Sequence, residues 1–92
     1  MKVNIEPIGI MKNYFPLPRI EITLRESATL ADLFNEVGVS LGDKLADAIW
    51  NREKSRFRGP VLLWSNGELI KDDATQLHDG QKIELRRYLV GG

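Results

Sequence analysis

Alternating hydrophobic and polar residues predict the strands of this chain. The alternation covers residues 2–6, 20–25 and 82–86, and a period of two is typical of strands with one buried face. A short apolar run at 61–64 predicts a further strand. Asn66-Gly67 follows it and favours a type I′ hairpin turn, which leads into a short strand.

Apolar residues at helical spacing predict one main helix between the second and third predicted strands. Thr29 is suited to the N-cap, Asp32 to the first turn, where the helix dipole favours a carboxylate, and Gly38 to the helix end. A second, shorter helix is predicted over residues 41–49, and a polar, basic loop over 51–59. The stripe of the main helix consists of Leu30, Leu33, Phe34 and Val37.

The order of these elements indicates an α+β fold. Two strands precede the helices, and a strand, a short strand and a last strand follow them. The helical stretch is long enough to cross over to a parallel strand. The expected fold is a ubiquitin-like β-grasp, a mixed four- to five-stranded sheet with the main helix and a second short helix on one face. We expect one domain over residues 1–87, followed by an extended tail over 88–92.

Composition narrows the classes of function. Thirteen basic residues balance thirteen acidic ones, so no overall field attracts nucleic acid or an anionic membrane. The chain has no cysteine and a single histidine, His78, which excludes a thiolate nucleophile, cysteine-bound metal and a pair of histidines. With no long apolar segment and no secretory signal, we expect a cytoplasmic protein without a conventional active site.

The sequence ends in Gly91-Gly92 after an apolar, extended run. Two glycines form a thin segment that can enter a narrow tunnel and present a carboxylate there. The motifs that accompany this ending lie in one order along the chain: Thr29 to Leu33 at the helix start, Val61 to Gly67 with its Asn-Gly turn, Leu77 with Asp79-Gly80, Lys82 to Leu85, and Gly91-Gly92.

In this combination the chain resembles the ubiquitin-like sulfur carriers of the MoaD/ThiS family, and most of all the small subunit of molybdopterin synthase. The resemblance implies that an E1-like activating enzyme uses ATP to adenylate the carboxylate of Gly92. Sulfur then replaces AMP and leaves a C-terminal thiocarboxylate. It also implies a sulfur-accepting partner, such as a molybdopterin synthase large subunit, and no cofactor bound to the carrier. Neither nucleic acid nor membrane is an expected partner.

The residues before the terminal glycine are the expected partner contacts. They are Gly91, Val90, Leu89, Tyr88, Arg87 and Arg86. Tyr88 equally suits the end of the last strand, whereas Leu89 and Val90 suit a groove on a partner. Arg86 and Arg87 suit either steering towards an acidic activating enzyme or solvated positions at a strand end. Trp50 suits either the core or an interface, and Trp64 suits packing.

Other functions remain open at this level. The bulky residues 88–90 and the basic segment 51–58 depart from the family pattern, so thiamine, cysteine or tungsten-cofactor pathways are alternatives to molybdopterin synthesis. A ubiquitin-like protein modifier would use the same activated terminus to form isopeptide bonds. A β-grasp interaction module without covalent chemistry is the third alternative.

Overall fold

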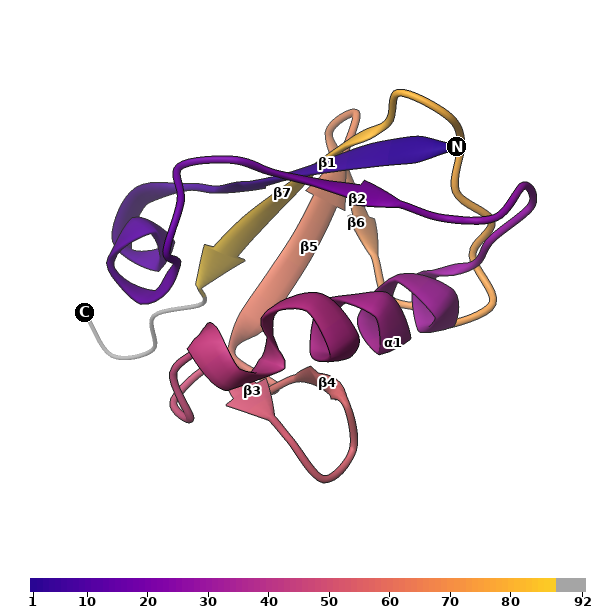
Figure 1. The fold of residues 1–92 in the computed structure, drawn as a ribbon. Helices are drawn as coiled ribbons and strands as arrows, with labels where there is room; N and C mark the ends of the chain where they lie inside the picture. Colours follow the sequence, from indigo (N-terminus) through magenta and orange to yellow (C-terminus); the bar gives the residue numbers. More distant parts are fainter. Residues whose placement is uncertain (88–92) are drawn as a thin grey trace.

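Five strands form one mixed sheet in the computed structural model, which describes residues 1–87 (Figure 1). The strands lie in the order β2-β1-β7-β5-β6. β1 is parallel to β7, and the other neighbours are antiparallel. The predicted first hairpin and parallel crossover are therefore both present. The bounds are Lys2–Pro7 (β1), Ile20–Thr23 (β2), Val61–Ser65 (β5), Glu68–Ile70 (β6) and Lys82–Arg87 (β7).

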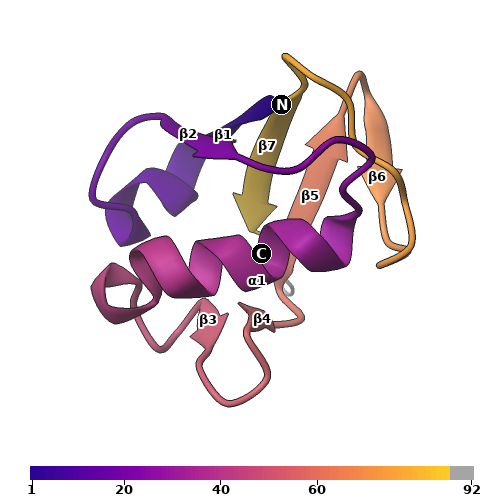
Figure 2. The ribbon, with the colours of Figure 1, turned by 45° about the vertical axis from the view of Figure 1, so that its right-hand side comes forward.

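One helix, α1 (Leu30–Leu41), lies across one face of this sheet (Figure 2). Its buried side chains include the whole predicted stripe and meet the inward-facing side chains of the central strands, among them Val3, Ile5, Ile83 and Leu85. One helix on one face of a mixed sheet is the predicted β-grasp arrangement, so the fold class is confirmed. Within residues 1–87 no helix has the length and apolar character needed to cross a bilayer.

The start of α1 forms the predicted cap. The Asp32 backbone N–H donates to Thr29 Oγ1 over 3.4 Å, and the Thr29 backbone N–H donates to Asp32 Oδ2 over 2.8 Å, which completes a capping box. The hydrogen bond from the Thr29 backbone, helped by the nearby Arg25 guanidinium, holds the pKa of the Asp32 carboxyl below its usual value.

Asp32→Asn is expected to lower stability at neutral pH, and the difference from the unchanged protein should shrink in acid. The folded state favours the ionised Asp32, because its pKa is lower folded than unfolded. This contribution is complete above the unfolded pKa of about 4 and is lost as the pH falls towards the folded pKa. Urea unfolding of both proteins across this range measures the difference. A difference that stays constant down to about pH 3 would contradict the assignment.

The hairpin between β5 and β6 is the predicted type I′ turn. Asn66 and Gly67 have φ values of 53° and 78°, and Ser65 pairs with Glu68 directly across the turn. Two consecutive positive φ values define this turn, and the Asn-Gly pair adopts them at little cost.

The prediction that Gly38 ends the main helix is wrong. The helix continues to Leu41, and Gly42 follows as its C-cap with φ −49°. A Cβ atom at Gly38 would lie 3.3 Å from a ring carbon of Trp50 and 3.4 Å from Ser55 Oγ. The missing side chain therefore makes room for a tryptophan beside the helix instead of providing a left-handed residue.

The second helix is much shorter than predicted. It is a single 3-10 turn, Gly42–Lys44 (η2), and the chain is extended at Leu45. Leu45 and Ile49 are nevertheless buried, at 2% and 0% exposure. Their apolar spacing thus reflects burial in the core rather than a continuous helix over 41–49.

The predicted loop at 51–59 contains a two-stranded ribbon of its own. β3 (Trp50–Asn51) pairs antiparallel with β4 (Arg56–Phe57), and Trp50 lies opposite Phe57. The two rings are 4.9 Å apart in an edge-to-face arrangement, and Trp50 is 1% exposed. Of the two alternatives for Trp50, the structure shows the core position.

A 3-10 helix, Gly9–Tyr14 (η1), occupies the connection between β1 and β2, and the sequence pattern does not predict it. Met11 in this helix is completely buried. Just before the helix, the Ile8 backbone N–H donates to the carbonyl of Leu85 over 2.9 Å. The helix therefore packs beside the carboxyl end of β7, where the predicted site begins.

Candidate functional site

The predicted site residues divide into two groups. Arg86 and Arg87 are the last residues of β7. Tyr88, Leu89, Val90, Gly91 and Gly92 lie outside the described residues. The structural basis of the site is therefore the end of β7 and the surfaces around it. β7 lies between β1 and β5, so it is held by strands on both sides.

Arg87 is fixed by a residue 73 positions earlier in the sequence. Its Nη1 donates to Tyr14 Oη over 2.5 Å, and its guanidinium carbon lies 5.1 Å from the centre of the Tyr14 ring. A hydrogen bond and a cation–π contact thus join the end of β7 to η1. Both alternatives for Arg87, steering and a solvated strand end, overlook this structural contact.

Arg86 has a different environment because successive residues of a strand point to opposite faces. Its Nη2 lies 3.1 Å from Glu84 Oε1 in an exposed ion pair, and its strand partner across the sheet is Leu62. Such a pair contributes little to stability, and it leaves Arg86 accessible to a partner.

Tyr14→Phe is expected to lower the free energy of unfolding by about 1 kcal/mol, because it removes the hydrogen bond to Arg87 and keeps the ring. Urea unfolding measures the change. The control is the same substitution in an Arg87→Ala background, where the hydrogen bond is already lost and the expected change is close to zero. Equal costs in both backgrounds would show that the Tyr14 hydroxyl acts without Arg87.

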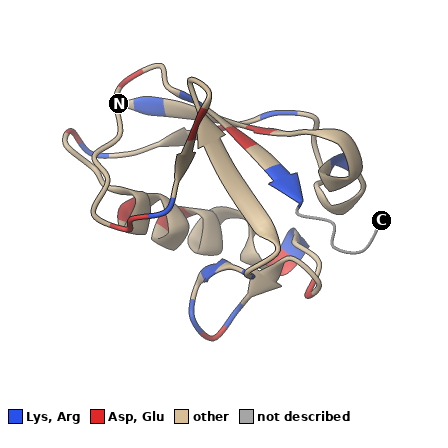
Figure 3. Ribbon diagram, turned by 180° about the vertical axis from the view of Figure 1, so that it is seen from behind, with Lys and Arg blue, Asp and Glu red and all other residues tan. Residues whose placement is uncertain are grey.

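The sheet face opposite α1 carries a group of apolar side chains, which we name the open-face patch: Leu62, Trp64 and Leu69. Trp64 pairs with Leu69 on one side and with Glu84 on the other, and Leu62 pairs with Arg86. The patch therefore extends to Arg86, the second-to-last residue of β7. Figure 3, turned by 180° from Figure 1, shows charged residues along β7 and uncharged residues along β5.

Trp64 lies beside a shallow hollow of about 310 Å³, lined by Trp64, Gly67, Glu84 and Arg86. Its indole Nε1 is shielded from solvent and finds no acceptor among residues 1–87. Trp64 is half-buried on the sheet face that α1 does not cover, so any packing of this side chain lies outside the main core.

The remaining chemical candidates give no site of their own. Within the described part of the chain, no three residues of the types His, Cys, Asp and Glu come together to hold a metal ion. His78 is exposed in the turn before β7, where its backbone N–H donates to Gln81 Oε1 over 2.9 Å. Among the described residues, the candidate site therefore consists of the end of β7 and the open-face patch.

Comparison with known proteins relates this geometry to solved structures. No protein-family model and no curated protein matches the chain. Small archaeal modifier protein 1 from Haloferax volcanii superposes with a TM-score of 0.77 at 13% identity, with all of both chains covered. A Pyrococcus furiosus protein described as molybdopterin converting factor subunit 1 gives 0.65 at 18% identity, covering 96% of this chain and 98% of its own.

The chain has the ubiquitin-like β-grasp fold. A chain of the Amycolatopsis orientalis BexX/CysO complex shares it, with a TM-score of 0.62 at 12% identity over 98% of this chain and 99% of that one. The resemblance predicted from the sequence motifs is therefore confirmed in the fold. At these identities the likeness shows the shared β-grasp fold.

Proposed function

We propose that this β-grasp protein is a sulfur carrier whose reacting group is the carboxylate of Gly92. The observation that carries the proposal is the position of β7. This central strand ends at Arg87, held by Tyr14, and the sequence continues for five residues to Gly91-Gly92. In this proposal residues 1–87 form the domain, and the five residues that follow present the carboxylate of the second of two glycines. Structural neighbours described as molybdopterin converting factor subunit 1 and CysO support the proposal of a carrier function.

The chemistry requires an activated carboxylate. A carboxylate is a poor electrophile, so a partner enzyme transfers AMP from ATP to the Gly92 oxygen and releases pyrophosphate. Hydrosulfide from the sulfur donor then attacks the acyl carbon, the bond from that carbon to the AMP oxygen breaks, and AMP leaves together with a proton, so that a thiocarboxylate remains. The carrier supplies the reacting carbon and oxygen, and the partner supplies the catalytic groups. The chain in this proposal is not itself an enzyme.

Two partners would use the same surface at different times. The activating enzyme and the sulfur-accepting enzyme must both hold the tail, so both must lie near the end of β7. The open-face patch adjoins that end through the pairing of Leu62 with Arg86. An apolar centre with a charged rim is typical of protein interfaces. The structure of CysO in a complex with BexX supports a protein partner for this fold.

Molybdopterin synthesis is the proposed destination of the sulfur. It agrees with the sequence motifs and with the fold of molybdopterin converting factor subunit 1. A second function, conjugation to other proteins, is favoured by the fold shared along the whole chain with small archaeal modifier protein 1. Both functions begin with the same adenylation.

Intact mass measures the proposed reaction directly. The full chain, labelled with ¹⁵N, is incubated with a lysate of its source, ATP and a sulfur donor, and the labelled species are weighed. The expected result is a mass gain equal to the exchange of one oxygen for sulfur, localised to the C-terminal fragment and absent without ATP. A fully labelled chain that is recovered unchanged, while a known carrier added to the same lysate is converted, would overturn the proposal.

A denaturing gel of the same incubation separates the two functions. A carrier remains a single band at its own mass, whereas a modifier gives ATP-dependent labelled bands of higher mass. Bands that resist reducing agent and carry an isopeptide bond to a lysine would favour the modifier.

A further inference from the structure

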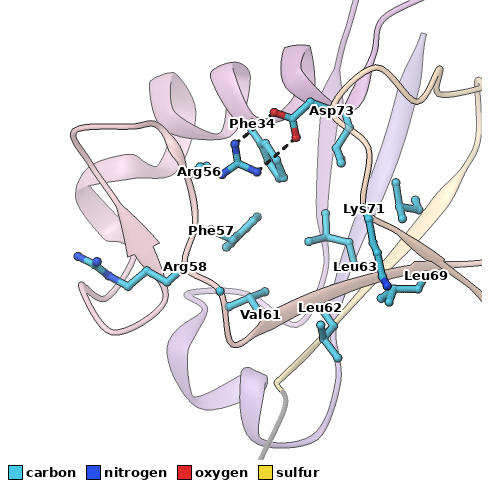
Figure 4. Close-up of a pocket in the computed structure, with 13 residues that line it drawn as sticks. Phe34, Arg56, Phe57, Arg58, Val61, Leu62, Leu63, Leu69, Lys71 and Asp73 are labelled. Atoms are coloured by element: carbon cyan, nitrogen blue, oxygen red, sulfur yellow. Dashed lines mark hydrogen bonds and ion pairs between the residues drawn. The ribbon is translucent and has the colours of Figure 1, made fainter.

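A groove on the helix side of the sheet is not explained by the carrier function. It lies between the first half of α1, the ribbon β3–β4 and the strands β5 and β6 (Figure 4). Its volume is about 350 Å³, which is at the small end of ligand pockets and suits a few side chains rather than a large cofactor. Phe34, Phe57, Val61 and Leu63 form its apolar base. Leu62 and Leu69 also line it, so the groove and the open-face patch share two residues.

The walls of the groove are held in place by other contacts. Phe57 packs edge-to-face against Phe34 and Trp50, at 5.9 and 4.9 Å between ring centres. On the opposite wall, the carbonyl of Asp73 accepts a hydrogen bond of 3.0 Å from the backbone of Ala31 at the start of α1. The groove is therefore formed in advance, so a ligand would lose little free energy in ordering it.

The charge of the groove is positive although the chain as a whole is neutral. Asp73, the only acidic residue among the described residues that line it, is matched by Arg56 in a two-bond ion pair of 3.2 and 3.3 Å. Arg58 points away from the apolar base and donates to the carbonyl of Asp47. Lys71 lies beside Leu69 and makes no ion pair within residues 1–87. One uncompensated cation thus lies next to an apolar hollow.

The groove is also continuous with the site of the tail. Val61 lines the groove and is the strand partner of Arg87, the last described residue of β7. A protein that holds the tail can therefore reach the groove around the start of β5.

We propose that the groove binds an extended segment of a tail-binding partner, which places an aliphatic side chain on Phe57 and Leu63 and a neighbouring carboxylate beside Lys71. The proposal rests on the carrier function only for the identity of the partner. An acidic, aliphatic segment is the chemistry that complements both the apolar base and the uncompensated charge.

An NMR titration of the full ¹⁵N-labelled chain tests this surface without any activating enzyme. The probe is the blocked peptide acetyl-Glu-Leu-Asp-Leu-Glu-amide, and the comparison peptide has Lys in place of each acidic residue. The protein variants are Lys71→Glu and, as a matched control, Lys44→Glu in the exposed turn η2.

The acidic peptide is expected to shift amide signals around Phe57, Leu63 and Lys71, and the basic peptide is expected to leave them in place. Lys71→Glu should weaken binding roughly tenfold, and Lys44→Glu should leave it unchanged. Absence of shifts, equal response to both peptides, or shifts confined to Trp64, Glu84 and Arg86 would each overturn the proposal. Because the titration requires no thiocarboxylate, its failure is distinct from failure of the mass measurement.

Discussion

Deletion of Gly92 is expected to abolish the oxygen-for-sulfur exchange completely and to leave the melting temperature unchanged. The proposed reaction takes place on the Gly92 carboxylate, and a chain ending at Gly91 places its carboxylate one residue short of the partner's catalytic groups. Gly92 lies outside residues 1–87, in which the last buried core residue is Leu85, so the deletion removes no described core contact. Intact mass after the ATP incubation measures the first effect, and thermal unfolding measures the second.

A substitution on an exposed position of the domain provides the control. Val39 is 76% exposed on α1 and lies outside the groove and the open-face patch, so Val39→Ala should keep both the exchange and the melting temperature. Two results would contradict the proposed separation of domain and tail. One is full exchange in the chain that lacks Gly92, and the other is unfolding of that chain at ordinary temperature.

Trp50→Ala is expected to lower the free energy of unfolding by about 3–5 kcal/mol, a large part of the total for a small domain. Trp50 is 1% exposed, meets the Phe57 ring at 4.9 Å and fills the space beside Gly38. Its removal leaves a cavity between α1 and the ribbon β3–β4 that these neighbours cannot fill. Urea unfolding followed by circular dichroism measures the loss.

The chain contains its own control in a second tryptophan. Trp64 is half-buried on the open sheet face, so Trp64→Ala should cost clearly less than Trp50→Ala, about 1–2 kcal/mol. The same variant should bind the activating enzyme more weakly, because it removes the centre of the open-face patch. Equal losses of stability from both substitutions would contradict the assignment of one tryptophan to the core and the other to an interface.

The main strands and the helix could be predicted because each repeats its pattern over several residues. Alternation identifies β1, β2 and β7, and the capping residues Thr29 and Asp32 identify the start of α1. The ribbon β3–β4 could not be predicted in this way, since one pair, Trp50 with Phe57, carries its burial and polar residues surround it. The 3-10 helix η1 likewise buries a single residue, Met11, and so shows no period.

In the candidate site, too, features that depend on neighbouring residues could be predicted from the sequence, and contacts between distant residues could not. The proposed reactive end can be predicted from the sequence, because the proposed chemistry depends on two adjacent residues, Gly91-Gly92. The opposite orientations of Arg86 and Arg87 follow from the geometry of a strand. The contact between Arg87 and Tyr14 joins residues 73 positions apart and depends on how η1 folds back on β7, so no local pattern indicates it.

The parallel pairing of β1 with β7 also has a mechanical consequence. Force applied between the beginning of β1 and the end of β7 acts along these two strands in opposite directions. The hydrogen bonds between them then lie across the direction of pull and share the load, instead of opening one after another. Tension between the end of β7 and the beginning of β1 would therefore act in the direction in which the sheet resists best, and the domain would stay folded under it.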